Sequence, residues 1–209
     1  MNDKKMKEKV LKSYETNDYV SKWRTREYLD FELMMFEKVI ELLPEDANIL
    51  SIGCGSGYHD KYFSESGFNL TGIDFSKRLI GKAKKNNPKA RYIISDMEDY
   101  EITEKYDLIM ALFSIINIPR KRHGAMFKKI HEGLKDYGLF LVTIRPEDVG
   151  DYQLKENWCG KDMYFSYYDY ETYIQMLTEI GFDLVESHKM SDYGSSDTNS
   201  YVILRKRKK

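Results

Sequence analysis

The chain has 209 residues, 42% hydrophobic and 14% aromatic residues, and a formal net charge of −1. This composition excludes a disordered chain, and the near-neutral charge argues against a strong electrostatic field for nucleic acid. No apolar run approaches the roughly 20 residues of a membrane span, and residues 1–5 lack the apolar core of a signal peptide. We therefore expect a cytoplasmic protein with one domain and a sizeable core. Cys54 and Cys159 form no CxxC pair and are expected to be free thiols.

The first 44 residues fall into three parts. Residues 1–12 are rich in lysine, and we expect them to be frayed. Residues 14–28 mix aromatic side chains with arginines, a pattern compatible with an aromatic lid over a ligand or with plain packing. Apolar residues from Leu29 to Leu43 recur at spacings of four and three, which predicts an amphipathic helix that ends at Pro44. We interpret residues 1–44 as an N-terminal helical cap.

The chain is organised around a short apolar run that leads into alternating glycines. Residues 48–52 predict a strand, and Gly53, Gly55 and Gly57 predict a tight turn that lets a ligand lie against main-chain N–H groups. The helix that follows points its positive end at the same place. A glycine cluster alone is weak evidence for a ligand site, so its meaning depends on the rest of the chain.

Two further strands are predicted to end in acids. Residues 69–74 end in Asp74, which follows Gly57 at close to the roughly 20-residue interval typical of a ribose-binding carboxylate. Ser76 can cap the next helix. Residues 91–95 predict a third strand, and Asp96 follows it directly.

The alternation of strands and helices continues to residue 145. Residues 106–118 form a long apolar stretch typical of a central parallel strand, and residues 139–145 predict the fifth strand. The helix between them carries His123 and His131 among charged residues, so we expect both histidines to be solvated. Right-handed crossovers between such short connections require an open parallel sheet with helices on both faces. Residues 45–145 are thus the expected ligand-binding core.

Past Arg145 the pattern changes. Residues 146–168 show no sustained period but many aromatic side chains, and we interpret them as a loop over the carboxyl edge of the sheet. A helix capped by Asp169 follows, and residues 182–187 and 201–204 predict an antiparallel hairpin. Residues 169–209 are therefore expected to form a C-terminal helix and hairpin.

From about Asn48 to Leu204, the sequence resembles a class I S-adenosylmethionine-dependent methyltransferase, of the small single-domain, type 11/12-like kind. The resemblance lies in four loose motifs that together are specific: residues 49–57, 72–76, 95–97 and 111–117. It implies an α/β fold with a Rossmann-like, seven-stranded, mostly parallel sheet, helices on both faces and an antiparallel C-terminal hairpin, all in one domain spanning residues 1–209. It also implies S-adenosyl-L-methionine as cofactor.

The resemblance assigns roles to individual residues. Asp74 would accept from both ribose hydroxyls, Phe75 would flank adenine, Asp96 would accept from the adenine amino group, and the Met97 backbone would meet the ring. The residues that it implies for cofactor binding are Gly53, Cys54, Gly55, Ser56, Gly57, Asp74, Phe75, Ser76, Asp96, Met97, Ala111, Leu112 and Phe113.

Two departures from the family pattern concern the chemistry of the site. The family usually has an acid where Ser51 stands, a residue that positions the charged methionine end of the cofactor. Relatives often carry a histidine or an acid near Asn117. His59 is expected at the surface. The sequence therefore leaves the catalytic side chain, if a general base is used, unassigned, and because the four histidines are scattered we predict no metal site.

The acceptor is expected to be a small molecule, enclosed between the two aromatic-rich segments. The candidate substrate-binding residues are Tyr14, Tyr19, Trp23, Asn117, Arg145, Trp158 and Tyr168. Two alternatives stay open, namely an RNA or protein methyltransferase and a non-catalytic S-adenosylmethionine-binding protein. An NAD-dependent oxidoreductase is disfavoured because its GxGxxG fingerprint needs a small residue where Tyr58 stands.

Overall fold

A computed structural model describes residues 3–16, 27–158, 161–193 and 198–208. The main sheet has seven strands in the order β3-β2-β1-β4-β5-β9-β8. Five strands pair in parallel, and they are β1 (Asn48–Ile52), β2 (Asn69–Asp74), β3 (Arg91–Ile94), β4 (Tyr106–Ala111) and β5 (Leu134–Ile144). The antiparallel edge is formed by β8 (Phe182–Lys189) and β9 (Ser200–Lys206). The predicted fold class is confirmed.

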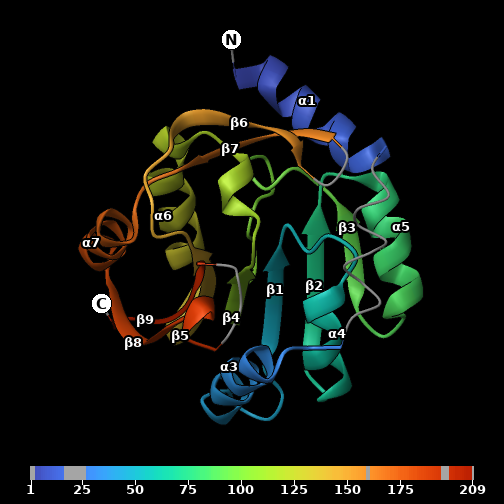
Figure 1. The fold of residues 1–209 in the computed structure, drawn as a ribbon. Coiled ribbons are helices and arrows are strands. Elements are labelled where there is room, and N and C mark those ends of the chain that lie inside the picture. Colours follow the sequence, from blue (N-terminus) through green and yellow to red (C-terminus); the bar gives the residue numbers. More distant parts are fainter. Residues whose placement is uncertain (1–2, 17–26, 159–160, 194–197, 209) are drawn as a thin grey trace.

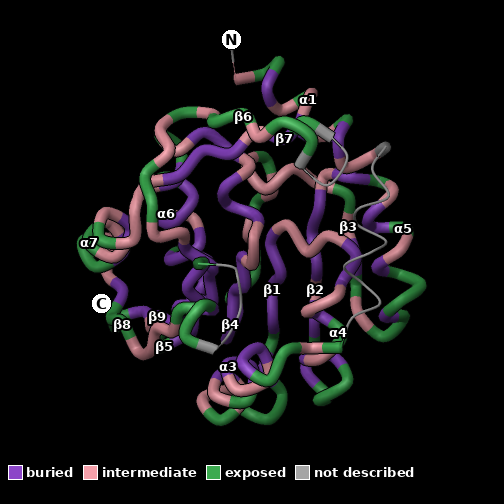
Figure 2. The backbone as a smooth tube through the Cα atoms, viewed as in Figure 1, coloured by how far each residue is buried: buried purple, intermediate pink, exposed green. Residues whose placement is uncertain are grey.

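Helices cover both faces of this sheet because neighbouring residues of each central strand point to opposite sides. Leu50 packs in one apolar cluster with residues of two helices, whereas Ile49 packs in a second cluster with residues of two others. The first pair is α6 (His123–Gly133) and α7 (Tyr170–Ile180), and the second pair is α3 (Asp30–Glu41) and α4 (Tyr58–Glu65). A further helix, α5 (Lys77–Asn86), packs on β2 and β3. The central strands are buried along their length (Figure 2).

The carboxyl edge of the parallel strands lies beneath two covering elements. Figure 1 shows α1 (Asp3–Thr16) and the strands β6 (Gly150–Trp158) and β7 (Lys161–Tyr167) lying across the edge at which the arrows of β1 and β2 end. β6 and β7 form a separate two-stranded antiparallel sheet. Short 3-10 turns complete the connections, at Ile115–Asn117, Arg120–Arg122 and Met190–Tyr193. No helix within the described residues is long and apolar enough to cross a bilayer.

The prediction that residues 1–12 are frayed is wrong, because α1 begins at Asp3 and packs on β7. Met6 and Val10, four residues apart on one helix face, are only 2% and 1% exposed. The Lys9 Nζ donates to the Tyr164 hydroxyl at 3.0 Å, and the Ser13 hydroxyl donates to the Asp162 carbonyl at 2.9 Å. The prediction relied on the high lysine content and overlooked these apolar residues, which recur four apart on one face of the helix.

The prediction of a loop over residues 146–168 is also wrong in part, because β6 and β7 are regular strands. Met163, Phe165 and Tyr167 are buried at alternating positions of β7. In β6 the alternation is broken by register shifts and by the positive φ of Tyr152, 59°. The alternation of buried and exposed residues that would predict a strand is interrupted here, and the many aromatic residues make it harder to recognise in the sequence.

His123 and His131 are buried rather than solvated. They lie on the side of α6 that faces the rest of the domain. The His123 Nδ1 lies 2.6 Å from the Tyr173 hydroxyl, and its Nε2 lies 3.0 Å from the Ile118 carbonyl oxygen. Two good partners for the ring nitrogens make burial of this polar ring acceptable.

Candidate active site

The glycine turn after β1 is fastened to the end of β2. Gly53, Gly55 and Gly57 have φ angles of 68°, 57° and 73°, a left-handed backbone that glycine adopts without steric cost. The Gly55 N–H donates to Asp74 Oδ2 at 3.0 Å, and the Ser76 N–H donates to Asp74 Oδ1 at 2.8 Å. One carboxylate therefore holds the turn and the start of α5 in place.

The glycines of this turn differ in their surroundings. A Cβ on Gly53 would lie 2.3 Å from the Cβ of Ser114, whereas a Cβ on Gly55 would have no protein atom within 4 Å. Gly53 thus allows close packing of two loops. Gly55 instead leaves space for a ligand on the turn.

A cavity of about 870 Å³ opens beside the turn, a size typical of sites for small molecules. Many residues of the sequence prediction line it, and they come from α1, the glycine turn, the ends of β2 to β5 and the loop after β4. Those predicted for the cofactor are residues 53–56, Asp74, Phe75, Asp96, Met97, Leu112 and Phe113. Those predicted for the substrate are Tyr14, Asn117 and Arg145.

Four other predicted residues do not appear in the cavity lining. Gly57 and Ser76 are the N-caps of α4 and α5, and Ala111 is buried at the end of β4. Tyr168 lies elsewhere, with the guanidinium carbon of Arg120 4.7 Å from its ring centre. Tyr19 and Trp23, and the side chain of Trp158, lie outside what the structure describes.

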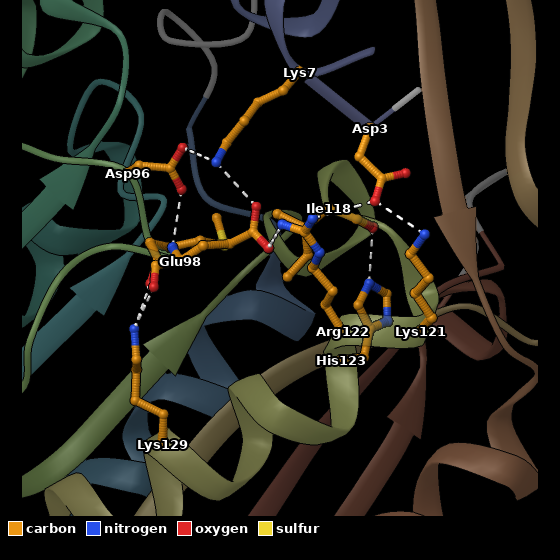
Figure 3. Close-up of polar contacts among 10 residues, drawn as sticks. Asp3, Lys7, Asp96, Glu98, Ile118, Lys121, Arg122, His123 and Lys129 are labelled. Atoms are coloured by element: carbon orange, nitrogen blue, oxygen red, sulfur yellow. Dashed lines mark hydrogen bonds and ion pairs between the residues drawn. The ribbon is translucent and has the colours of Figure 1, made fainter. Parts of the chain in front are cut away.

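The acid after β3 is paired with α1. Figure 3 shows the Lys7 ammonium between the carboxylates of Asp96 and Glu98. The Glu98 carboxylate also pairs with the Arg122 guanidinium at 2.7 Å. Burial alone would lower the pKa of Lys7, but its bonds to Asp96 and Glu98 raise it above the ordinary value. Lys7 is therefore charged at neutral pH, and it holds α1 over this end of the cavity.

Tyr14 and Asn117 meet in the cavity lining. The Asn117 Nδ2 donates to the Tyr14 hydroxyl at 3.2 Å, and the Asn117 Oδ1 is buried without a hydrogen-bond partner among the described residues. Burial raises the pKa of Tyr14 to about 12. Its hydroxyl is therefore neutral at physiological pH, and the Asn117 carbonyl can accept from a ligand.

Arg145 lines the cavity directly after the end of β5. Its guanidinium carbon is 5.6 Å and 5.4 Å from the ring centres of Phe165 and Tyr167 on β7. Its Nε is buried without a hydrogen-bond partner in the described part of the chain. An arginine packed over two rings with an unused N–H can bind an anionic ligand group.

His59 also lines the cavity, contrary to the expectation of a surface residue. Its Nε2 lies 3.4 Å from the Oε1 of Glu32, and its ring stacks on Phe113 at 6.1 Å. Glu32 is buried on α3 and accepts from the Tyr201 hydroxyl at 3.1 Å. Sequence reasoning missed this network because its members lie far apart in the chain.

Asp60 is a second residue that sequence reasoning missed. It lies in the first turn of α4, is 1% exposed and lines the cavity beside Ser51. Its nearness to Gly57 in the sequence was the available signal, because the first turn of a helix that begins at a ligand-binding turn faces the ligand. Within the described ranges, no group of three His, Cys, Asp or Glu side chains is arranged to hold a metal ion.

The lining fits a nucleoside with a cationic side chain. The open face of Gly55 accepts close approach, the carboxylates of Asp74 and Asp60 accept hydrogen bonds, and Phe75 offers apolar surface. S-adenosylmethionine has groups that match this lining, namely ribose hydroxyls and positive charge for the carboxylates and an adenine ring for the apolar surface.

Comparison with known proteins agrees with this chemistry. A family described as methyltransferase domain matches residues 21–187. A dTDP-3-amino-3,4,6-trideoxy-alpha-D-glucopyranose N,N-dimethyltransferase of Streptomyces venezuelae is 26% identical over 101 residues, 47% of this chain and 43% of that protein. An 18S rRNA (guanine-N(7))-methyltransferase of Bos taurus is 27% identical over 157 residues, 68% of this chain and 56% of that protein.

The fold is shared with solved methyltransferases. The magnesium protoporphyrin IX methyltransferase of Synechocystis with bound SAH superposes with a TM-score of 0.72 at 15% identity, over 97% of this chain and 100% of that one. The family match spans most of the chain. The chain therefore belongs to the methyltransferase domain family, and it is a class I S-adenosylmethionine-dependent methyltransferase.

Proposed function

We propose that this methyltransferase acts on a small molecule, which it holds against the cofactor inside the cavity. The enclosure of the cavity carries the proposal. Tyr14 from α1, Gln153 and Lys155 from β6, and Phe165 and Tyr167 from β7 line it from above the sheet edge. A cavity covered in this way suits a compact acceptor.

The cofactor supplies a methyl group on a sulfonium, whose sulfur is its own leaving group. The protein has to hold the acceptor in line with that methyl group, and such orientation contributes about 7–11 kcal/mol. The glycine turn and Asp74 bind the cofactor in this proposal. A carboxylate has about four lone-pair sites, so the bonds from Gly55 and Ser76 are compatible with acceptance from ribose hydroxyls.

The acceptor occupies the end of the cavity near Arg145. The buried Nε of Arg145 and the buried Oδ1 of Asn117 offer one donor and one acceptor to a ligand. The rings of Phe165 and Tyr167 lie beside the guanidinium. We infer an acceptor that carries a carboxylate or phosphate group and an apolar body.

Alanine at position 55 is expected to weaken S-adenosylmethionine binding more than about tenfold, because the added methyl group enters space that the cofactor needs. The cost in folding stability should be only about 1–2 kcal/mol from the left-handed backbone. Calorimetric titration and urea unfolding measure the two effects. Gly53→Ala, whose Cβ meets Ser114, should instead lose more stability than Gly55→Ala.

An RNA or protein acceptor is the second candidate, since one relative is named for 18S rRNA. A net charge of −1 provides little counterion release for a polymer. The experiment is to incubate the enzyme and methyl-labelled S-adenosylmethionine with fractionated cell extract.

We expect label in the fraction of small acidic molecules. Arg145→Met should reduce that label while it leaves S-adenosylmethionine affinity within about threefold, because Arg145 contacts the acceptor alone. Label in RNA or in protein would overturn the small-molecule proposal. Tight cofactor binding without transfer to any fraction would favour a non-catalytic binding protein.

A further inference from the structure

Asp60 is a buried acid without a positive partner. It is 1% exposed, and its Oδ2 has no hydrogen-bond partner among the described residues. None of the groups that shift its pKa is cationic. A buried carboxylate in this state is costly unless a ligand supplies positive charge or N–H donors.

The neighbours of Asp60 come from three strands and from the glycine turn. The hydroxyls of Ser51 on β1 and Tyr92 on β3 hydrogen-bond to the carboxyl group. Asp74 at the end of β2 acts on it electrostatically, as does Cys54. Burial raises the pKa of Asp60 to about 7, although the two hydroxyl bonds lower it. The group can therefore lose its proton near neutral pH.

The position of this carboxylate is set by the β1–β2 pair. Ser51 pairs with Gly72 in the parallel register. A Cβ on Gly72 would lie 3.0 Å from Asp60 Oδ2 and 2.6 Å from the Tyr92 ring. Glycine at position 72 thus leaves room for Asp60 above the two strands. The acid is also part of the cavity lining beside the glycine turn.

We propose that Asp60 binds the ammonium group in the methionine part of the cofactor. This inference rests on the proposed placement of the cofactor on the glycine turn. Asp60 then takes the role that an acid at the position of Ser51 usually has in the family, while Ser51 orients the Asp60 carboxylate. Asp60 lies beside Ser51 in the cavity lining and supplies a negative charge there, although position 51 itself has none.

Two ligands separate this role from a structural one. S-adenosylhomocysteine carries the ammonium group, whereas methylthioadenosine has the same nucleoside without the amino-acid part. We expect Asp60→Asn to weaken binding of S-adenosylhomocysteine by about 10- to 100-fold, the usual worth of a hydrogen bond to a charged group. Binding of methylthioadenosine should change less than threefold.

The matched control is Asp46→Asn, which changes an exposed acid before β1 and should affect neither ligand. Equal affinities of wild type and Asp60→Asn for S-adenosylhomocysteine, or equal losses for both ligands, would overturn the role of Asp60. If wild type binds neither nucleoside, the placement of the cofactor fails first, and this inference fails with it.

The pH dependence of wild-type binding is a test that needs no variant. The affinity for S-adenosylhomocysteine should rise about tenfold from pH 6 to pH 8 as Asp60 ionises, and binding should release protons. Burial raises the pKa of Cys54 and of Tyr92, so neither titrates in this range. Methylthioadenosine affinity should be flat. A flat profile for S-adenosylhomocysteine would overturn the proposal.

Discussion

Replacing Asp74 by alanine is expected to weaken S-adenosylmethionine binding by about two to four orders of magnitude. The change removes the proposed acceptor for both ribose hydroxyls, and each hydrogen bond to a charged group is worth roughly 1.5–3 kcal/mol. Two such bonds correspond to about 3–6 kcal/mol, and each 1.4 kcal/mol is tenfold in Kd. Calorimetric titration of the cofactor into wild type and variant measures the loss.

Asp74→Ala also acts on the fold. Asp74 is 7% exposed, and its two oxygens accept from the N–H groups of Gly55 and Ser76. Loss of a buried acceptor leaves such donors unsatisfied, at about 1–3 kcal/mol. The variant should therefore show a lower Tm, and titrations belong at a temperature at which circular dichroism shows it folded.

Asp46→Ala is the control for removal of an acid, since Asp46 is exposed before the amino end of β1. It should bind the cofactor as wild type does. NADH should give no heat with either protein. Unchanged affinity in folded Asp74→Ala would remove the ribose role of Asp74, and heat from NADH would revive the oxidoreductase alternative.

Local patterns were sufficient to predict the main sheet. The apolar strand, the glycines and Asp74 lie within one short stretch, and the parallel pairing of β1 with β2 follows from the crossover through α4. Asp74 and Asp96 both line the cavity with Gly55 because parallel strands end at the same edge. Such features depend on sequence neighbours and on handedness, so a single sequence contains them.

The covering elements were harder to predict because their burial depends on distant partners. α1 buries Met6 and Val10, and Val10 packs in a cluster whose other buried members are remote in sequence. Its ion pair from Lys7 to Asp96 joins residues whose partnership no local period indicates. The same limit applies to His59 and Glu32, which meet only because α3 and α4 pack on the same face.

Asp60 shows a different limit of prediction from the sequence. A motif aligned position by position reports that Ser51 lacks the family's carboxylate. The structure places the Asp60 carboxylate against the Ser51 hydroxyl. The two residues belong to β1 and α4, and only the packing of this strand and helix brings them into one site, so a motif read along the chain does not show their contact.

The second large effect expected is a loss of stability in acid through His123. Burial lowers the pKa of His123 to about 4, against about 6.5 for an exposed histidine. Between these values the unfolded chain binds a proton that the folded chain excludes. Stability is therefore full above about pH 6.5 and is lost as pH falls toward 4. At about 1.4 kcal/mol per pKa unit the loss approaches 3 kcal/mol.

The test compares urea unfolding of wild type and His123→Gln at pH 7.5, 5.5 and 4.5. Glutamine has both a donor and an acceptor for Ile118 and Tyr173, but it does not titrate. The variant should be less stable at pH 7.5, and its deficit should shrink by about 3 kcal/mol at the lowest pH. A deficit that stays constant with pH would mean that the folded protein accommodates a charged His123, and the ring would then need an acidic partner in place of the Tyr173 hydroxyl.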